Sequence, residues 1–307
     1  MIDLYGRNID YLRVSITDRC NLHCRYCLPP GLEAAEKDRE RYLTKEEILR
    51  VCRAAETIGI HKFKITGGEP LVRPEALEII RELKALPGTE AVTLTTNGLL
   101  LKKALPEFQK LSIDGINVSL DTLKPERFSW ITGLNRDGRE LWSGVLETLK
   151  EGAFMGIPMK INCVPIRGFN EDEILDFVEL TRELPMDVRF IELMPIGEGK
   201  AFQGRDKEEL LAVIRKVYPD FKETAEKRGN GPAVYGKVPG FAGYVAENIA
   251  QFTTLEGLPL AGGFGLNVTN PLSAKEYAAL GARMLTLSPE LTLEDMARIS
   301  APVPVLA

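Results

Sequence analysis

Three cysteines lie close together near the start of the chain, with three and then two residues between them. Cys20, Cys24 and Cys27 follow directly after an apolar stretch at residues 12–16. Thiolates this close in one loop, at the end of an expected strand, can converge on one soft metal centre. In a cluster of four irons, three thiolates would leave one iron open, and an open iron can hold a reactive cofactor.

Two other uses of clustered cysteines compete with this interpretation. Five cysteines in 307 residues are too sparse for the disulfide framework of a secreted protein. A structural zinc site needs four closed ligands, and the fourth would have to come from His23, His61, Cys52 or Cys163. The last two fall on the apolar faces of an expected helix and an expected strand, so we interpret both as small core residues. Zinc remains the alternative to an iron–sulfur cluster.

The composition indicates a soluble globular protein with a sizeable core. Apolar residues make up 44% of the chain, and a net charge of −5 offers no broad basic surface for a nucleic-acid backbone. A length of 307 residues fits one large domain, or one domain with an appendage. The first residues show no secretory signal, and no apolar run approaches the ~20 residues that span a bilayer. We therefore expect a cytoplasmic protein without a membrane or nucleic-acid partner.

Strand and helix patterns alternate from residue 11 to about residue 218. Short apolar and β-branched runs predict strands at residues 11–16, 62–66, 91–96, 115–120, 159–164 and 188–193. Helical spacing predicts a helix that begins at a capping box of Thr44 and Glu47 and ends near residue 59. Further helices are predicted at residues 74–86, 139–155, 171–183 and 207–217. This alternation predicts an α/β fold with a parallel sheet, whose carboxyl edge gathers polar residues.

Two motifs at that edge resemble the radical S-adenosylmethionine (SAM) enzymes. The cysteine spacing, with an aromatic residue, Tyr26, before the last cysteine, is the hallmark of that superfamily. The sequence Gly67-Gly68-Glu69-Pro70 after the second strand is a weak signal alone, but in this position it resembles the SAM motif. The two together make zinc the minor alternative.

This resemblance implies a fold, cofactors and a reaction. The fold is a partial (β/α)6 radical SAM barrel. One 4Fe–4S cluster is bound by Cys20, Cys24 and Cys27, and SAM chelates its fourth iron. One electron then cleaves SAM to a 5′-deoxyadenosyl radical that abstracts hydrogen, while the protein orients the cofactor and excludes water.

A closer resemblance covers residues 4–243. Residues 12–20, 65–71, 94–98, 116–121 and 189–194 look like the GTP 3′,8-cyclase family, known as molybdenum cofactor biosynthesis protein A, which makes the precursor of molybdopterin. The resemblance implies that the substrate is GTP or a related nucleotide. It also implies a reductant protein such as flavodoxin or ferredoxin, and it allows a homodimer.

The same resemblance assigns individual residues. It implies SAM contacts from Tyr26, Gly68, Ser119 and Met194, beside Gly67 and Glu69 of the SAM motif, and GTP contacts from Arg13, Lys64, Thr95 and Lys160. The charges make sense by themselves, since three cations near one edge of a sheet suit a triphosphate. Arg13 and Lys64 stand in apolar strands, where a charge needs a reason.

The pattern changes after residue 243. The cyclase family continues there into a second cysteine cluster, whereas this sequence has no cysteine beyond Cys163. Residues 244–299 instead resemble part of the collagenase-like peptidase family, and their pattern predicts a βαβα unit with strands at 264–268 and 283–287 and helices at 273–280 and 293–299. We expect a core barrel at residues 1–218, a cyclase-like connector at 219–243 and a tail at 244–307. A natural fusion and a chimera both remain open.

Three functions are compatible with these patterns. The leading hypothesis is a radical SAM enzyme of the GTP cyclase type. The second is a radical SAM enzyme with another substrate, and the third is a chimera that binds a cluster without turnover. For the tail, we expect packing against the open side of the barrel, because six βα units leave an exposed strand edge. The bolder hypothesis is that two tail strands complete an eight-stranded barrel.

Overall fold

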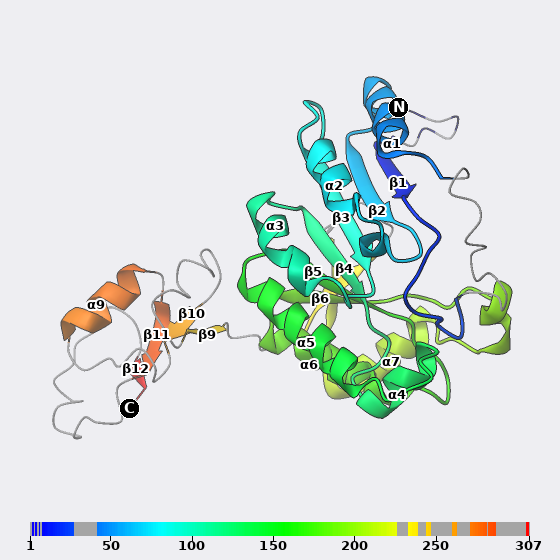
Figure 1. Cartoon of the computed structure of the whole chain (residues 1–307). Coiled ribbons are helices and arrows are strands. Elements are labelled where there is room, and N and C mark those ends of the chain that lie inside the picture. The colour runs from blue at the N-terminus through cyan, green and yellow to red at the C-terminus, as the bar shows by residue number, and fades with distance from the viewer. Residues whose placement is uncertain are drawn as a thin grey trace. The chain divides into compact units, whose positions relative to one another are not determined.

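The computed structural model describes residues 8–27, 42–225 and 233–238, together with residues 2, 4 and 6. In the tail it describes residues 244–246, 260–262, 271–280, 282–286 and 305–306. The chain divides into two compact units (Figure 1). The first holds Met1–Ala153, Ile157–Thr181 and Pro185–Pro239, and the second holds Gly240–Ala307 with the short segments Phe154–Gly156 and Arg182–Leu184.

A six-stranded parallel sheet forms the centre of the first unit. Its strands lie in chain order, β1-β2-β3-β4-β5-β6, and every neighbouring pair is parallel. The strands are β1 (Tyr11–Ser15), β2 (Lys62–Thr66), β3 (Ala91–Thr96), β4 (Gly115–Ser119), β5 (Met159–Cys163) and β6 (Met186–Phe190). An α/β fold with six parallel strands agrees with the predicted partial (β/α)6 barrel.

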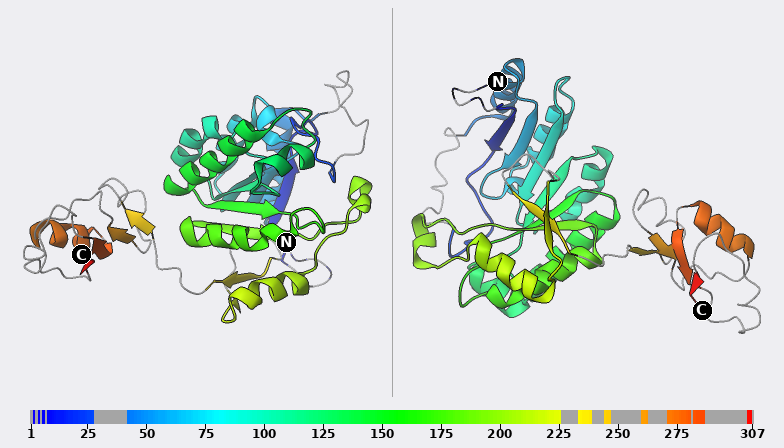
Figure 2. Two further views of the ribbon diagram at one scale, coloured as in Figure 1. Left: turned by 90° about the horizontal axis from the view of Figure 1, so that it is seen from below. Right: turned by 180° about the vertical axis from the view of Figure 1, so that it is seen from behind.

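Helices follow the strands and lie on the outer side of the sheet (Figures 1 and 2). They are α1 (Lys45–Thr57), α2 (Ala76–Lys84), α3 (Leu105–Lys110), α4 (Pro125–Ile131), α5 (Arg139–Phe154), α6 (Ile174–Glu183) and α7 (Lys207–Val217), with short 3₁₀ turns η2 (Pro70–Val72), η3 (Lys102–Ala104), η4 (Glu171–Glu173) and η5 (Gly197–Ala201). The predicted capping box of α1 is present, because Thr44 Oγ1 accepts a hydrogen bond from Glu47 N and Glu47 Oε2 accepts one from Thr44 N. The short helices α3 and α4 were not predicted.

The two sides of the sheet differ sharply in chemistry. Alternate residues of each strand pack under the helices, and the fully buried ones are Phe63, Ile65, Val92, Leu94, Ile116, Val118 and Ile161. Cys52 of α1 and Cys163 of β5 are also buried, which confirms their interpretation as core residues. The residues between these apolar positions are polar and lie on the opposite, inner face of the sheet. The fold therefore builds one apolar core and one polar inner face.

Strand β6 begins and ends earlier than the sequence pattern predicted. It begins at Met186 and ends at Phe190, although residues 188–193 were predicted. Met186 and Asp187 pair with Met159 and Lys160 of β5, so the strand starts earlier than the apolar pattern indicated. The amide of Ile191 still bonds to the sheet, but its side chain is already 41% exposed.

A short antiparallel hairpin follows α7. It consists of β7 (Lys222–Thr224) and β8 (Tyr235–Lys237), and it was not predicted within the expected connector. Phe221 and Val238, at its two ends, pack on a cluster of apolar residues from α6 and α7. Tyr235 of β8 places its ring centroid 5.0 Å from Lys160 Nζ on the polar face of the sheet.

The second unit has a sheet of its own. Its elements are β9 (Tyr244–Ala246), β10 (Leu260–Gly262), α9 (Pro271–Ala279), β11 (Ala282–Thr286) and β12 (Val305–Leu306), and the strands form a parallel sheet in the order β12-β11-β10-β9. Helix α9 and strand β11 correspond to the helix and strand predicted at 273–280 and 283–287. The strand predicted at 264–268 and the helix predicted at 293–299 lie outside the described residues.

Closure of the barrel by two tail strands is therefore wrong. The described tail strands pair only with one another, and the six-stranded sheet contains no strand from the tail. The physical reason is that the tail holds additional strands, β9, β10 and β12, which satisfy its backbone hydrogen bonds internally. None of the helices in the described part of the chain combines the length and the apolar composition that a membrane span requires.

Candidate active site

The cysteine loop begins directly after β1 and holds three free thiols. Cys20 and Cys24 are partly buried and Cys27 is exposed. Burial raises the pKa of all three thiols, most strongly that of Cys24. The negative charges of neighbouring thiolates raise the pKa of Cys24 and Cys27 further. Because these thiolates repel one another, a cationic centre bound between them would stabilise their charged forms.

The three thiols do not form a single-ion site among the described residues, and the cluster assigned to them stays a prediction. Across the residues that the structure describes, no three His, Cys, Asp or Glu side chains are arranged to hold one metal ion. A closed zinc site requires four ligands around one ion. In a 4Fe–4S cluster each thiolate binds a different iron, so the ligands surround the cluster instead of meeting at one atom.

The glycines of the SAM motif allow the second loop to lie directly on the first. Gly68 N donates to Thr17 O at 2.8 Å, and Glu69 N donates to Arg19 O at 2.8 Å. A Cβ atom on Gly67 would lie 2.4 Å from Thr17 O, and one on Gly68 would lie 2.4 Å from Arg19 O. These glycines are therefore required for the approach of the two loops, and their predicted contact with SAM stays a prediction.

We expect Gly68→Ala to disturb the cysteine loop, because the added methyl group would collide with backbone atoms of Asp18 and Arg19. Overpacking of this kind costs about 1–3 kcal/mol. Urea unfolding should show the loss of stability, and iron uptake during reconstitution should fall.

Gly144→Ala is the matched control for this change. Gly144 lies inside helix α5 and has no atom within 4 Å of an added Cβ. Alanine at that position should stabilise the protein by about 0.5–1 kcal/mol and leave iron uptake unchanged. Equal effects of the two substitutions would contradict the packing role of Gly68.

Glu69 is a buried link between β2 and β3. Its side chain is completely buried, and its Oε2 accepts from Asn97 N at 2.6 Å while its Oε1 accepts from Thr96 Oγ1 at 2.8 Å and from Leu71 N at 3.0 Å. Burial raises the pKa of Glu69, and these hydrogen bonds oppose the rise. The Glu69 carboxylate thus accepts hydrogen bonds from the protein itself. Glu69 would act on a ligand indirectly, by holding in place the loops that bind the ligand.

Asn97 is a site residue that was not singled out from the sequence. Its Nδ2 donates to Asn21 Oδ1 at 2.7 Å and lies 3.9 Å from Cys20 Sγ. The side chain therefore supports the first cysteine from the end of β3. The signal available in the sequence was its place in an Asn-Gly turn at the carboxyl end of a strand.

The remaining predicted SAM contacts are Tyr26, Ser119 and Met194. Tyr26 donates its hydroxyl hydrogen to Asp121 Oδ2 at 2.6 Å. Ser119 is exposed at the end of β4, and Met194 is 65% exposed after β6. A Cβ on Gly199 would lie 2.7 Å from Met194 O and 3.5 Å from Tyr26 O, so Met194 and Tyr26 border the same glycine.

The predicted GTP residues all lie on the polar inner face. Arg13 of β1 is the direct strand partner of Lys64 of β2, and Thr95 of β3 aligns through Asn117 with Lys160 of β5. Burial lowers the pKa of Lys64 to about 8, and the charges of Arg189, Arg13 and Lys160 lower it further. Electrostatic interactions weaken with distance. The effect of these three charges on the pKa of Lys64 therefore indicates that all four cations lie close together on one face.

Arg189 was not predicted as a site residue. It lies on β6 beside Asn162, whose Oδ1 accepts from Arg189 Nε at 3.0 Å, and a second guanidinium nitrogen bonds to Asn117 Oδ1. A charged residue between apolar Val188 and Phe190 was the available signal, because alternation places it on the inner face.

The four cations differ in their existing partners. Lys160 is paired with Asp187 at 2.7 Å, and Arg189 is held by two asparagines. Within the described part of the chain, Arg13 and Lys64 make no hydrogen bond or ion pair through their side chains. Two uncompensated cations on neighbouring strands form a site for an anion.

The family model for the radical SAM superfamily matches residues 14–181. GTP 3′,8-cyclase from Clostridium perfringens strain 13 is 43% identical over 251 residues, which cover 80% of this chain and 74% of the relative. The enzyme of that name from Moorella thermoacetica is 43% identical, covering 80% and 75%. This chain belongs to the GTP 3′,8-cyclase family of radical SAM enzymes.

A longer relative is similar over the same share of the chain, and two solved structures are similar in fold. Molybdenum cofactor biosynthesis protein 1 of Drosophila melanogaster is 44% identical over 248 residues, covering 80% of this chain and 42% of that protein. The structure of Streptococcus suis SuiB bound to S-adenosylmethionine superimposes with a TM-score of 0.54 at 21% identity, covering 69% of this chain and 48% of SuiB. TYW1 with a bound lysine–pyruvate adduct gives a TM-score of 0.51 at 18% identity, covering 71% and 76%. These two structures show a shared fold.

Proposed function

We propose that this radical SAM protein is a GTP 3′,8-cyclase of molybdenum cofactor biosynthesis that abstracts hydrogen from GTP. The observation that carries the proposal is the combination, in one barrel, of the cysteine loop at the carboxyl edge and the cationic inner face beside it. Relatives named GTP 3′,8-cyclase support the same substrate. A peptide substrate would not require four cations on that face.

The proposal assigns a separate role to each group of residues. Cys20, Cys24 and Cys27 would hold one 4Fe–4S cluster, because they are free thiols on one loop whose charges destabilise one another. Backbone atoms of Gly67 and Gly68 with Tyr26, Ser119 and Met194 would hold SAM. Such a cluster would supply the electron for the cleavage of SAM, and SAM would supply the radical chemistry that abstracts hydrogen.

The inner face would orient the nucleotide relative to that edge. Arg13 and Lys64 would bind the triphosphate, since neither has an anionic partner among the described residues. Lys160 and Arg189 would extend the cationic surface, and the Thr95 hydroxyl would supply a neutral hydrogen bond. Tyr235 of the β8 strand borders Lys160 and would limit the access of water on that side.

The cysteine content of the sequence bears on the number of clusters in the proposal. The absence of a cysteine after Cys163 in this sequence leaves one cluster in the proposal. A cluster-binding protein without turnover would share the cysteine loop but would transfer no hydrogen from a nucleotide. Transfer of hydrogen from GTP to 5′-deoxyadenosine is therefore the experiment that tests the proposed function.

A further inference from the structure

Asp121 is a buried carboxylate that the proposed chemistry does not use. It follows β4 directly and its exposed fraction is 8%. Its Oδ2 accepts the Tyr26 hydroxyl hydrogen at 2.6 Å, and its Oδ1 accepts from Val164 N at 2.8 Å. Asp121 therefore joins the cysteine loop to the end of β5, across 95 and 43 residues of sequence.

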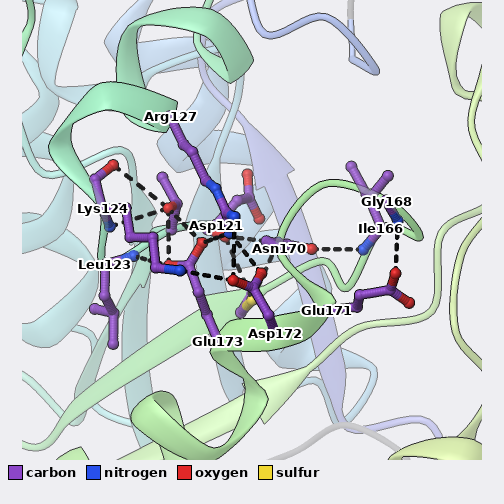
Figure 3. Close-up of polar contacts among 12 residues, drawn as sticks. Asp121, Leu123, Lys124, Arg127, Ile166, Gly168, Asn170, Glu171, Asp172 and Glu173 are labelled. Atoms are coloured by element: carbon purple, nitrogen blue, oxygen red, sulfur yellow. Dashed lines mark hydrogen bonds and ion pairs between the residues drawn. The ribbon is translucent and has the colours of Figure 1, made fainter.

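The backbone of Asp121 is held by a second buried residue. Asn170, 2% exposed, donates from Nδ2 to Asp121 O at 2.6 Å (Figure 3). The same nitrogen donates to Val164 O at 2.9 Å. Its Oδ1 accepts from Ile166 N at 2.7 Å. The carboxylate consequently points at Tyr26 from a rigid support, because each of its neighbours is itself hydrogen-bonded.

Tyr26 lies between two cysteines, so its position sets theirs. Cys24 is two residues before it, and Cys27 follows it and donates from its amide to Cys24 O at 2.9 Å. On the opposite side, the amide of Arg25 donates to Ile131 O at 2.9 Å and the amide of His23 donates to Thr132 O at 3.0 Å. The loop is thus attached to helix α4 by its backbone and to Asp121 by a side chain.

The charge of Asp121 also reaches the cysteines. The carboxylate lies within hydrogen-bonding distance of Tyr26, 2.6 Å from its hydroxyl oxygen, and Tyr26 stands between Cys24 and Cys27 in the loop. A negative charge that opposes a thiolate also opposes the arrival of an electron at a cluster bound there.

We propose that Asp121 is a positioning residue, which holds Cys24 and Cys27 through Tyr26 and whose fixed negative charge makes the bound cluster harder to reduce. This inference rests on the proposed cluster but not on the identity of the substrate. A cluster with a more negative reduction potential is, once reduced, a stronger donor of the electron that SAM cleavage requires.

The test is a redox titration of reconstituted protein at pH 8, followed by electron paramagnetic resonance. Burial raises the pKa of Asp121 to about 6, so the carboxylate is ionised at that pH. Asp121→Asn keeps the size of the side chain and removes the charge. We expect full iron content, a reduction potential shifted to a more positive value, and SAM cleavage slowed about tenfold. Full iron content with an unchanged potential would overturn the proposal.

Asp172→Asn is the matched control. Asp172 lies in the same region and is paired with Lys124 and Arg127, each at 2.6 Å (Figure 3). Among the described residues, it makes no hydrogen bond or ion pair with the cysteine loop. Its substitution should leave iron content, potential and cleavage rate unchanged. Changes of equal size in the two variants would show a general effect of removing a carboxylate and would overturn the proposal.

If Asp121→Asn does not fold, Tyr26→Phe provides the test of the proposal. This substitution removes the hydroxyl and leaves the carboxylate, so cleavage should slow about tenfold while the potential stays close to that of the unmodified protein. Unchanged cleavage in Tyr26→Phe would contradict the proposal. Failure of the unmodified protein to bind iron would instead contradict the proposed function, so the two failures are distinguishable.

Discussion

Serine in place of Cys20, Cys24 or Cys27 is expected to abolish the formation of 5′-deoxyadenosine from SAM. Each thiolate would hold a different iron of the cluster, and the serine hydroxyl, which stays protonated near neutral pH, is a poor replacement for a soft anionic donor. Each single variant should lose at least about a thousandfold in cleavage rate, as expected when a unit of cooperating residues is broken. The measurement is chromatography of the nucleoside products after anaerobic reduction of reconstituted protein with SAM.

Cys52→Ser and Cys163→Ser are the controls for this prediction. Both thiols are buried in the core, and burial raises the pKa of Cys52 to about 11. Serine there buries a hydroxyl group and lowers stability by about 1–3 kcal/mol, but iron content should not change. Substantial 5′-deoxyadenosine from any of the three loop variants would show that the cluster ligands were misassigned.

Lys64→Met should weaken the binding of GTP by about ten- to a hundredfold near pH 7, which corresponds to one charge-assisted hydrogen bond of about 1.5–3 kcal/mol. Lys64 is surrounded by Arg189, Arg13 and Lys160 and has no anionic partner among the described residues, so a phosphate group would be its first counter-charge. Equilibrium titration of the reconstituted protein with GTP measures the change.

The dependence of this affinity on pH follows from the lowered pKa of Lys64, about 8 compared with the usual value of 10.5. The side chain is a cation below pH 8 and becomes neutral as the pH rises through that value. GTP binding by the unmodified protein should therefore weaken from pH 7 to pH 9, as binding comes to require uptake of a proton. Lys64→Met should lose this part of the pH dependence.

Lys62→Met provides a control from the same strand and the same face. Lys62 is already paired with Asp10 at 2.7 Å and lies two positions nearer the amino end of β2. Its loss should change GTP affinity by less than about threefold. If the two lysine variants weakened binding equally, a general loss of positive charge would explain the effect, and a specific role for Lys64 would be excluded.

Local patterns in the sequence were sufficient for much of the barrel. The six strands were predicted because each has a short apolar or β-branched run between turn residues, and the start of α1 because Thr44 and Glu47 satisfy each other's backbone donors. The cysteine loop and the Gly67–Gly68 turn follow the first two strands, so their proximity at the carboxyl edge followed from the parallel topology.

Interactions between distant residues were not accessible in the same way. The link between Tyr26 and Asp121 and that between Asn97 and Asn21 join residues 95 and 76 positions apart, and no local pattern encodes such pairs. Strands β9 and β12 of the tail were missed because they are only a few residues long and derive their stability from pairing with β10 and β11. The function of Glu69 as an internal acceptor likewise depends on donors from β3.

The most direct test of the whole account uses GTP that carries deuterium on its ribose carbons. Reconstituted protein, expected to hold about four irons per chain, would be reduced anaerobically with SAM and this GTP, and the 5′-deoxyadenosine formed would be analysed by mass spectrometry. The account predicts one deuterium in most of the 5′-deoxyadenosine, and much slower formation of that product when GTP is omitted. Undeuterated 5′-deoxyadenosine, formed at the same rate with and without GTP, would contradict it.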